Sequence, residues 1–374
     1  MSVNRAFFII SIIISICYLP FYGFSDMTEE DVEELFFIPS PTGYEDLMSE
    51  KIIQKFPDYE SVSNDLLGSV YFSRDGNSPH ISIICGMDEL GYIVGGIDSQ
   101  GTITLDRVVQ SPYPSFDSFF PGHSMEVWTE KGPVKGVLAV PSLHIFPRRE
   151  RENFAEYFTL EKMRLDVGAS GREQVLEKGI QNCAPVTPEK KIGYLQDGKM
   201  AGYFIGQKAC AALLVKIAEK VLAEEDLGKV TIGWLAQTRM VSRGSSPRAC
   251  AGGVRAGKYL DSFENIVIGV FPTDGLRNED IHIGKGPVLI GKWEGASKLK
   301  KLISETAESR NIKIQTAGKY ETLLLNAFSG GKKDSAGLFI PAKFAFSPSE
   351  VIDFKDVKAL EKLVVSVLSE RRKR

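Results

Sequence analysis

The sequence predicts an α/β protein, in which a mixed sheet lies between helices and a small β-domain is inserted into the chain. Apolar strand-like runs alternate with helical patterns before residue 92 and after residue 160, and this alternation is typical of a sheet that helices cover on both faces. Residues 92–160 instead contain short strand-like runs separated by Gly and Pro, which indicates a separate β-domain. We therefore expect residues 26–91 and 161–374 to form one α/β domain around an insertion at 92–160.

Residues 1–25 are expected to be a signal peptide. Arg5 precedes an apolar run that extends from Ala6 to Phe24, and the small residues Gly23 and Ser25 suit a signal-peptidase site after Ser25. The chain would then be exported to the periplasm, the envelope or the medium. The alternative is an uncleaved N-terminal segment that anchors the protein in the membrane. No later apolar run in the sequence is long enough to span a bilayer.

Two helices are expected before the first buried strand. Thr28-Glu-Glu-Asp31 has the pattern of a capping box at a helix N-terminus. The turn-forming string Pro39-Ser-Pro-Thr-Gly-Tyr-Glu45 separates this helix from a second one, which ends near Phe56.

A buried strand is expected to begin at Ile81. It is followed by a tight turn at Gly86, the acidic pair Asp88-Glu89, and another strand that opens at Tyr92. A turn that follows a strand places its carboxylates at the edge of a sheet, where they could take part in binding or chemistry.

The chain after the insertion is expected to alternate between helices and strands. Gln207–Leu222 is the clearest helix, because its apolar side chains recur every three or four residues. The other expected helices are Lys298–Ser309 and Asp356–Leu368, and the expected strands are Lys229–Ala236, Asn265–Phe271, Ile312–Thr316 and Gly337–Pro341.

Composition argues against a nucleic-acid partner, because the net charge is −3 and no basic face is implied. Apart from Cys17 in the N-terminal run, the cysteines are Cys85, Cys183, Cys210 and Cys250. They are widely spaced and form no CxxC pair, so they indicate neither a zinc cluster nor a disulfide scaffold. An even number permits disulfides in an exported protein, but the pairing stays open.

Several strings resemble those of the co-catalytic metallo-aminopeptidases, the family of glutamyl, deblocking and tetrahedral aminopeptidases. Gly86-Met-Asp-Glu-Leu-Gly91 is similar to that family's His-Met-Asp-Glu-Ile-Gly, and both Pro39–Glu45 and Asp65-Leu-Leu-Gly-Ser69 are similar to its early motifs. Leu165–Ser170 resembles the family's return from the insertion into the main domain. The resemblance implies a zinc-aminopeptidase-like sheet, two zinc or cobalt ions as cofactors, and an inserted β-domain that makes oligomer contacts.

The resemblance also implies that this chain lacks the residues that bind those metals. The family's ligand positions fall on Gly86, Ile205, Arg239, Phe271 and Phe346, and its general-base position falls on Thr238. A two-metal peptidase needs carboxylates and imidazoles at these places. We therefore predict no catalytic residue, no metal and no cofactor for this chain.

Charged residues near these positions are the candidates for a binding cleft, namely Asp88, Glu89, Arg239, Lys332 and Asp334. We hypothesise that the Arg239 guanidinium occupies the vacated metal volume and pairs with Asp88, because a buried carboxylate needs compensation. The alternative is that Arg239 points to solvent.

The sequence therefore favours an exported, catalytically inactive relative of the aminopeptidases. Such a pseudo-peptidase would bind a peptide or assemble into a homo-oligomer through the inserted β-domain, and it would contact a membrane only if the N-terminal segment stays uncleaved. The alternative is an active metallo-aminopeptidase with a relocated or single metal site. A third possibility is a structural subunit that assembles with an active paralogue.

Overall fold

The computed structural model describes residues 25–56, 61–76, 79–109, 116–142, 144, 147–148, 159–224, 227–241, 249–274, 280–291, 297–318, 320–328 and 333–372. Apart from Ser25, the expected signal or anchor segment lies outside these ranges. Within them, no helix has both the length and the apolar character needed to cross a membrane.

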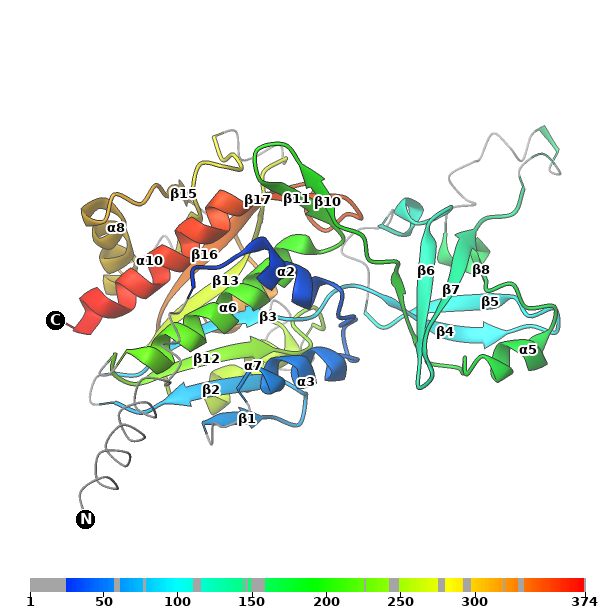
Figure 1. The fold of residues 1–374 in the computed structure, drawn as a ribbon, viewed down its shortest axis with the longest axis horizontal. Coiled ribbons are helices and arrows are strands. Elements are labelled where there is room, and N and C mark those ends of the chain that lie inside the picture. Colours follow the sequence, from blue (N-terminus) through cyan, green and yellow to red (C-terminus); the bar gives the residue numbers. More distant parts are fainter. Residues whose placement is uncertain are drawn as a thin grey trace, which may run out of the picture.

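An 11-stranded mixed sheet forms the centre of the larger domain (Figure 1). Its main path runs β1-β2-β12-β3-β13-β16-β17-β11-β10, and β14 joins β15 to β16 at its side. The strands β12, β3, β13 and β16 are parallel to one another. The bounds are β1 (Val62–Asn64), β2 (Val70–Arg74), β3 (Ile81–Gly86), β10 (Gly193–Leu195), β11 (Lys199–Gly202), β12 (Val230–Leu235), β13 (Glu264–Pro272), β14 (Val288–Gly291), β15 (Gln315–Ala317), β16 (Asp334–Lys343) and β17 (Glu350–Asp353).

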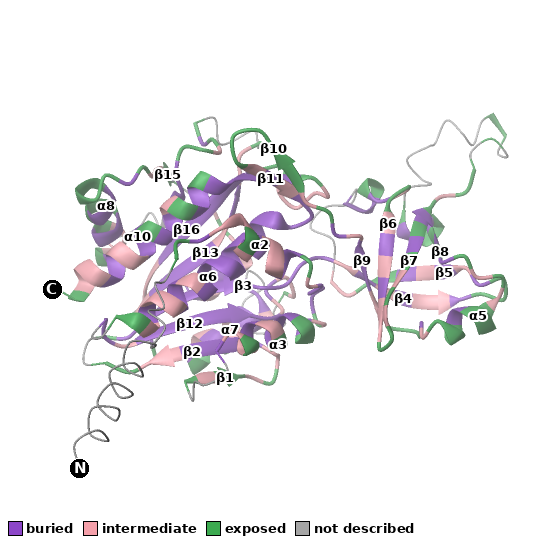
Figure 2. Ribbon diagram, in the orientation of Figure 1, coloured by how far each residue is buried: buried purple, intermediate pink, exposed green. Residues whose placement is uncertain are grey.

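Helices cover both faces of this sheet, as the alternating pattern predicts. One face packs against α2 (Glu29–Phe36), α3 (Asp46–Gln54), α6 (Ile205–Ala223), α8 (Lys298–Ser309) and α10 (Phe354–Arg372). The other packs against α7 (Ala251–Tyr259) and α9 (Leu323–Phe328). The central strands and α6 are accordingly buried along most of their length (Figure 2). A helix that is apolar on nearly every side needs such a position.

Local sequence signals explain where several of these elements begin. Thr28 caps α2 by accepting a hydrogen bond from the Asp31 N–H (3.4 Å), and the Asp31 carboxylate accepts one from the Thr28 N–H (2.7 Å), so the predicted capping box is confirmed. The predicted helix Lys298–Ser309 has the bounds of α8. The strand expected at 312–316 is displaced, because β15 covers Gln315–Ala317.

The inserted domain is a closed barrel with the strand order β4-β5-β8-β7-β6-β9. It has its own apolar core, which includes Leu105, Phe120, Val127 and Leu138. Figure 1 shows the barrel beside the α/β domain. Its elements are β4 (Tyr92–Ile97), β5 (Ile103–Arg107), η1 (Phe116–Phe119), β6 (Ser124–Thr129), β7 (Gly132–Ala139), η4 (Leu160–Lys162), β8 (Arg164–Asp166), α5 (Arg172–Glu177) and β9 (Pro185–Pro188).

The predicted end of the insertion, at residue 160, is wrong. Leu165 lies in β8, where it pairs with β5 and β7, and β9 closes the barrel against β4 and β6. The insertion therefore extends to Pro188, and Leu165–Ser170 is not the return into the main domain. The strands β8 and β9 are only three and four residues long, which is too short to show the alternating pattern of a longer strand.

Two chain segments connect the domains, and buried charges fasten them together. Glu89 lies between β3 and β4, and Lys190 lies between β9 and β10; their side chains form an ion pair and are 0% and 2% exposed. Lys208, on α6, lies 3.5 Å from the same carboxylate and donates a hydrogen bond to the Ser40 hydroxyl (2.6 Å). The junction therefore has a defined geometry even though only two segments cross it.

All four described cysteines are free thiols, and Cys85, Cys210 and Cys250 are buried. Burial raises the pKa of the Cys250 thiol to about 12. These side chains therefore act as small apolar groups.

Candidate functional site

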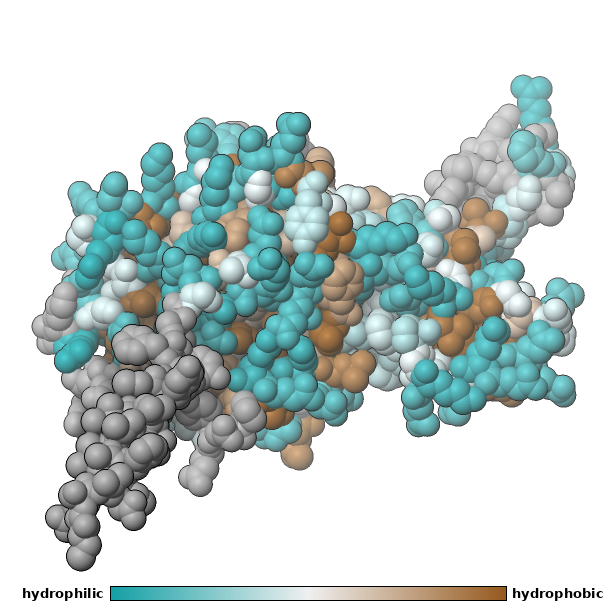
Figure 3. Space-filling view, viewed as in Figure 1, coloured by the Kyte–Doolittle hydropathy of each residue, from teal (hydrophilic) through white to brown (hydrophobic). Residues whose placement is uncertain are grey.

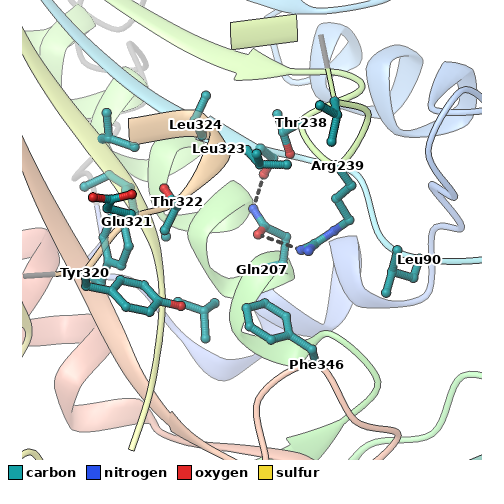
Figure 4. Close-up of a pocket in the computed structure, with 17 residues that line it drawn as sticks. Leu90, Gln207, Thr238, Arg239, Tyr320, Glu321, Thr322, Leu323, Leu324 and Phe346 are labelled. Atoms are coloured by element: carbon teal, nitrogen blue, oxygen red, sulfur yellow. Dashed lines mark hydrogen bonds between the residues drawn. The ribbon is translucent and has the colours of Figure 1, made fainter. Parts of the chain in front are cut away.

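A cavity of about 440 Å³ opens at the carboxyl-terminal edge of the parallel strands (Figure 4). Gly86 ends β3, and the turn that follows β12 brings Thr238 and Arg239 to the same edge, where ligands commonly bind in open α/β sheets. The lining residues are Gly86, Leu90, Gln207, Thr238, Arg239, Val241, Val267, Ile268, Gly269, Val270, Tyr320, Glu321, Thr322, Leu323, Leu324, Phe339 and Phe346.

Asp88 is fully buried and is hydrogen-bonded to two residues that line the cavity, Thr238 and Arg239. Its carboxylate accepts hydrogen bonds from the Thr42 hydroxyl (2.9 Å), the Arg239 N–H (3.0 Å) and the Thr238 hydroxyl. Three donors satisfy most of the acceptor capacity of a carboxylate. Asp88 thus holds the turn after β12 against the turn after β3.

Thr238 fills the space that a side chain at position 86 would need. A Cβ atom at Gly86 would lie 3.1 Å from the Thr238 methyl group, 3.2 Å from its Cβ atom and closer still to its hydroxyl oxygen. A histidine at position 86 therefore does not fit while Thr238 keeps its hydrogen bond with Asp88. Among the described residues, no three His, Cys, Asp or Glu side chains form a group that could hold a metal ion. The residues present here do not fit the metal pair that the resemblance implies.

Arg239 lies inside the site rather than in solvent. Its guanidinium carbon is 4.4 Å from the ring centre of Phe204 and 5.4 Å from that of Phe346. Its Nε atom donates to the main-chain oxygen of Asp88 (3.3 Å), and Nη2 donates to the side-chain oxygen of Gln207 (3.3 Å) (Figure 4). The hypothesis that the guanidinium pairs with Asp88 needs a correction, because the guanidinium contacts the carbonyl of Asp88 and not its carboxylate.

The other positions that the resemblance singled out have different surroundings. Ile205 is fully buried in the core between the sheet and its helices, whereas Phe204, one residue earlier, faces Arg239. At this point the structure thus places Phe204, and not Ile205, against the guanidinium. Phe346 lines the cavity as expected, while Phe271 is fully buried and packs against Tyr320, with 4.8 Å between the ring centres.

Three residues around the cavity have backbone conformations that side chains rarely adopt. The φ angles are 55° at Phe204, 53° at Gln237 and 65° at Phe346. Such conformations are costly for bulky residues and cluster at functional sites. They aim the rings of Phe204 and Phe346 at the guanidinium.

Two buried carboxyl groups near the site were not among the predicted residues. Burial and the neighbouring charge of Asp88 raise the pKa of Glu45 to about 8. This carboxyl group accepts hydrogen bonds from the N–H groups of Gln237 (2.8 Å) and Gly43 (3.0 Å). The only signal for it in the sequence is its place at the end of the Pro39–Glu45 string.

Glu350 is the second of these groups. Burial raises the pKa of its carboxyl group, which accepts hydrogen bonds from the N–H groups of Gly206 (2.7 Å) and Phe346 (2.8 Å). Both carboxyl groups thus position the loops that carry the cavity residues.

The remaining predicted cleft residues lie elsewhere. Glu89 does not line the cavity; it forms the buried ion pair with Lys190 at the domain junction. Asp334 begins β16 at the opposite edge of the sheet, where it accepts hydrogen bonds from the Ser297 hydroxyl (2.5 Å) and the Leu299 N–H (2.9 Å) at the start of α8. Lys332 lies outside the described residues.

Comparisons with known proteins agree with this fold. The chain is 24% identical to the lysyl aminopeptidase of Pyrococcus furiosus over 341 residues, which cover 89% of this chain and 94% of that protein. Among solved structures, the PhTET1-12s dodecamer matches with a TM-score of 0.78 and 21% identity, covering 91% of this chain and 98% of that one. The TET1 peptidase of Pyrococcus horikoshii matches with a TM-score of 0.77 and 21% identity, covering 90% and 98%.

The family assignment rests on a broader match. The sequence model of the M42 glutamyl aminopeptidase family matches residues 68–363, which is well over half of the chain. The predicted aminopeptidase-like α/β fold is thereby confirmed, and the chain belongs to the M42 glutamyl aminopeptidase family.

Proposed function

We propose that this protein is a non-hydrolysing member of the M42 family, which binds a peptide or a similar small ligand in the cavity of its altered site. The observation that carries the proposal is the contact between Gly86 and Thr238. The space for a side chain at position 86 is filled by a residue that is itself bonded to Asp88. Gly86 and Thr238 therefore fit each other in size, which favours a stable alternative site over a damaged metal site.

The Arg239 guanidinium gives further support. A fixed cation between two aromatic rings disfavours a divalent cation in the same place, because like charges at short range repel strongly where water is excluded. A hydrolytic site of this family would need a Lewis acid and an activated water. The residues described here offer a binding surface instead.

Metal content and turnover test this proposal together. Purified mature protein should be incubated with zinc or with cobalt, desalted, analysed for bound metal, and assayed on aminoacyl and short peptide substrates. We expect far less than one ion per chain and no turnover above that of the blank. One or two ions per chain together with metal-dependent release of N-terminal residues would instead support an active aminopeptidase with a relocated or single metal site.

We also propose that the protein forms a homo-oligomer through the inserted barrel. Two of the structural relatives are a dodecamer and a protein that assembles into a tetrahedron or an octahedral shell. Figure 3 shows hydrophobic side chains on the barrel and near its junction with the α/β domain. On the barrel, Phe119, Val137 and Leu176 are 42%, 49% and 45% exposed.

Light scattering on the eluate of a sizing column tests the assembly. Val137→Asp on the barrel should reduce the mass, while Leu66→Asp should leave it unchanged, because Leu66 is a highly exposed apolar residue of the other domain. A monomeric wild-type protein would refute the assembly proposal.

Export is the last part of the proposal, and it is supported by the apolar N-terminal run of the sequence. N-terminal sequencing of the protein from its own cells should begin at Asp26. A protein that retains residues 1–25 in the membrane fraction would be anchored instead.

A further inference from the structure

We infer that the cavity binds a ligand with a free carboxylate next to an apolar group, as at the C-terminus of a peptide, and that Arg239 binds this carboxylate. The inference rests on the proposed function, because the ligand must bind without being hydrolysed. It differs from what an aminopeptidase site recognises, which is the free N-terminus of a peptide.

The first argument is that the described neutral groups satisfy only part of the hydrogen-bonding capacity of the Arg239 guanidinium. Its described hydrogen-bond acceptors are a main-chain carbonyl and an amide oxygen, and two aromatic faces cover it. No described residue accepts a hydrogen bond from Nη1, and no described carboxylate forms an ion pair with this side chain. A partly buried cation without a direct counter-ion favours the binding of an anion.

The second argument is that the guanidinium is held in place before a ligand arrives. The rings of Phe204 and Phe346 contact it, and Gln207, which fixes Nη2, donates a hydrogen bond to the Gly86 carbonyl. A planar guanidinium with fixed orientation suits the two oxygens of a carboxylate better than a flexible ammonium does. The entropy cost of binding is lower for a site that is already ordered.

The third argument comes from the rest of the cavity. The lining also includes apolar side chains, among them Val267, Val270, Leu324 and Phe339. The volume of about 440 Å³ lies in the range of small-molecule sites, roughly 300–1,000 Å³. Burial raises the pKa of the Tyr320 hydroxyl to about 12, so this side chain stays neutral. An apolar side chain beside the carboxylate would fill this space.

The charge of Arg239 limits the ligand further. Figure 4 shows Arg239 and Glu321 on opposite sides of the cavity. A free ammonium group next to Arg239 would be repelled, because like charges at short range repel each other.

Titration calorimetry of the full mature protein with matched probes tests the inference. The probes are N-acetyl-L-phenylalanine, its C-terminal amide, and L-phenylalaninamide, which has a free amine and no carboxylate. We expect the acid to bind about tenfold more tightly than either amide, as one charge-assisted hydrogen-bonded pair would give. An acetylated tetrapeptide that ends in phenylalanine is a fourth probe. Comparing its affinity with that of N-acetyl-L-phenylalanine shows whether the site prefers the C-terminus of a peptide or a small free acid.

Variants assign the effect to Arg239. Arg239→Gln should abolish the preference for the acid, whereas Arg255→Gln, which removes a charge from α7 where it pairs with Asp65, should preserve it. Equal binding of the acid and its amide by the wild-type protein, tighter binding of the free amine, or no binding of any probe would overturn the inference. Each of these results is obtained with the wild-type protein. The metal-content and turnover test of the proposed function is a separate measurement, so either proposal can fail without the other.

Discussion

Replacing Gly86 by alanine is the sharpest test of how this site is built. The added Cβ atom would lie 3.1 and 3.2 Å from the Cγ2 and Cβ atoms of Thr238, and closer to Oγ1. Thr238 must then move away, which breaks its hydrogen bond to the Asp88 carboxylate. Loss of a hydrogen bond to a charged group costs about 1.5–3 kcal/mol, and overpacking costs about 1–3 kcal/mol. Because moving Thr238 relieves part of the overpacking, we expect Gly86→Ala to lower the free energy of unfolding by about 2–4 kcal/mol.

A double-mutant cycle tests whether the contact with Thr238, rather than any alanine at position 86, causes this loss of stability. Thr238→Ala removes the hydroxyl and methyl groups that the new Cβ atom meets, so Gly86→Ala should cost less than about 1 kcal/mol in that background. Gly193→Ala is the matched control, because its Cβ atom would lie 3.6 Å from the nearest atom, the Ala201 Cβ. Urea unfolding followed by circular dichroism gives the free energies. An unchanged Gly86→Ala penalty in the Thr238→Ala background would refute the reasoning.

Three further predictions concern carboxyl groups. Because the pKa of Glu45 is raised from 4.5 to about 8, folding takes up a proton between these values, so the free energy of unfolding should fall as pH rises through this window. Melting temperatures from pH 5 to pH 9 should show a weaker decline for Glu45→Gln. Glu89→Gln leaves two buried lysines without their carboxylate and should lower the free energy of unfolding by about 3–5 kcal/mol, while Glu33→Gln on the surface of α2 should change it little in the same urea titration. Asp334→Ala should cost about 0.5–2 kcal/mol, because the start of α8 loses its acceptor, yet calorimetry should show unchanged ligand binding.

Periodicity and turn chemistry predicted most of the larger domain, because they act over a few neighbouring residues. The helix near 207–222 and the strands near 229–236 and 265–271 correspond to α6, β12 and β13. The end of the insertion was missed because β9 belongs to the barrel through its pairing with β4 and β6, far away in the sequence. Such long-range pairing leaves no local pattern.

The site was predictable only in part for the same reason. Resemblance placed Gly86, Thr238 and Arg239 at one sheet edge, and the structure brings them together there. It could not show that Phe204 rather than Ile205 faces Arg239, because a φ angle of 55° at Phe204 changes the direction of the side chains where α6 begins. Asp334 was predicted to be a cleft residue, yet the parallel direction of β16 places it at the opposite edge of the sheet.

The buried carboxyl groups show what the altered centre requires. Burial raises the pKa values of Glu45 and Glu350, and both carboxyl groups accept hydrogen bonds from main-chain N–H groups of the surrounding loops. The hydrogen bonds at Asp88 come from two hydroxyl groups and one N–H group, while the acceptors that the described residues offer to the Arg239 guanidinium are neutral. Gly86→His alone would therefore add one metal ligand to a centre that already holds the guanidinium of Arg239. Thr238 and Arg239 would have to be replaced as well, because Thr238 fills the space that the histidine needs.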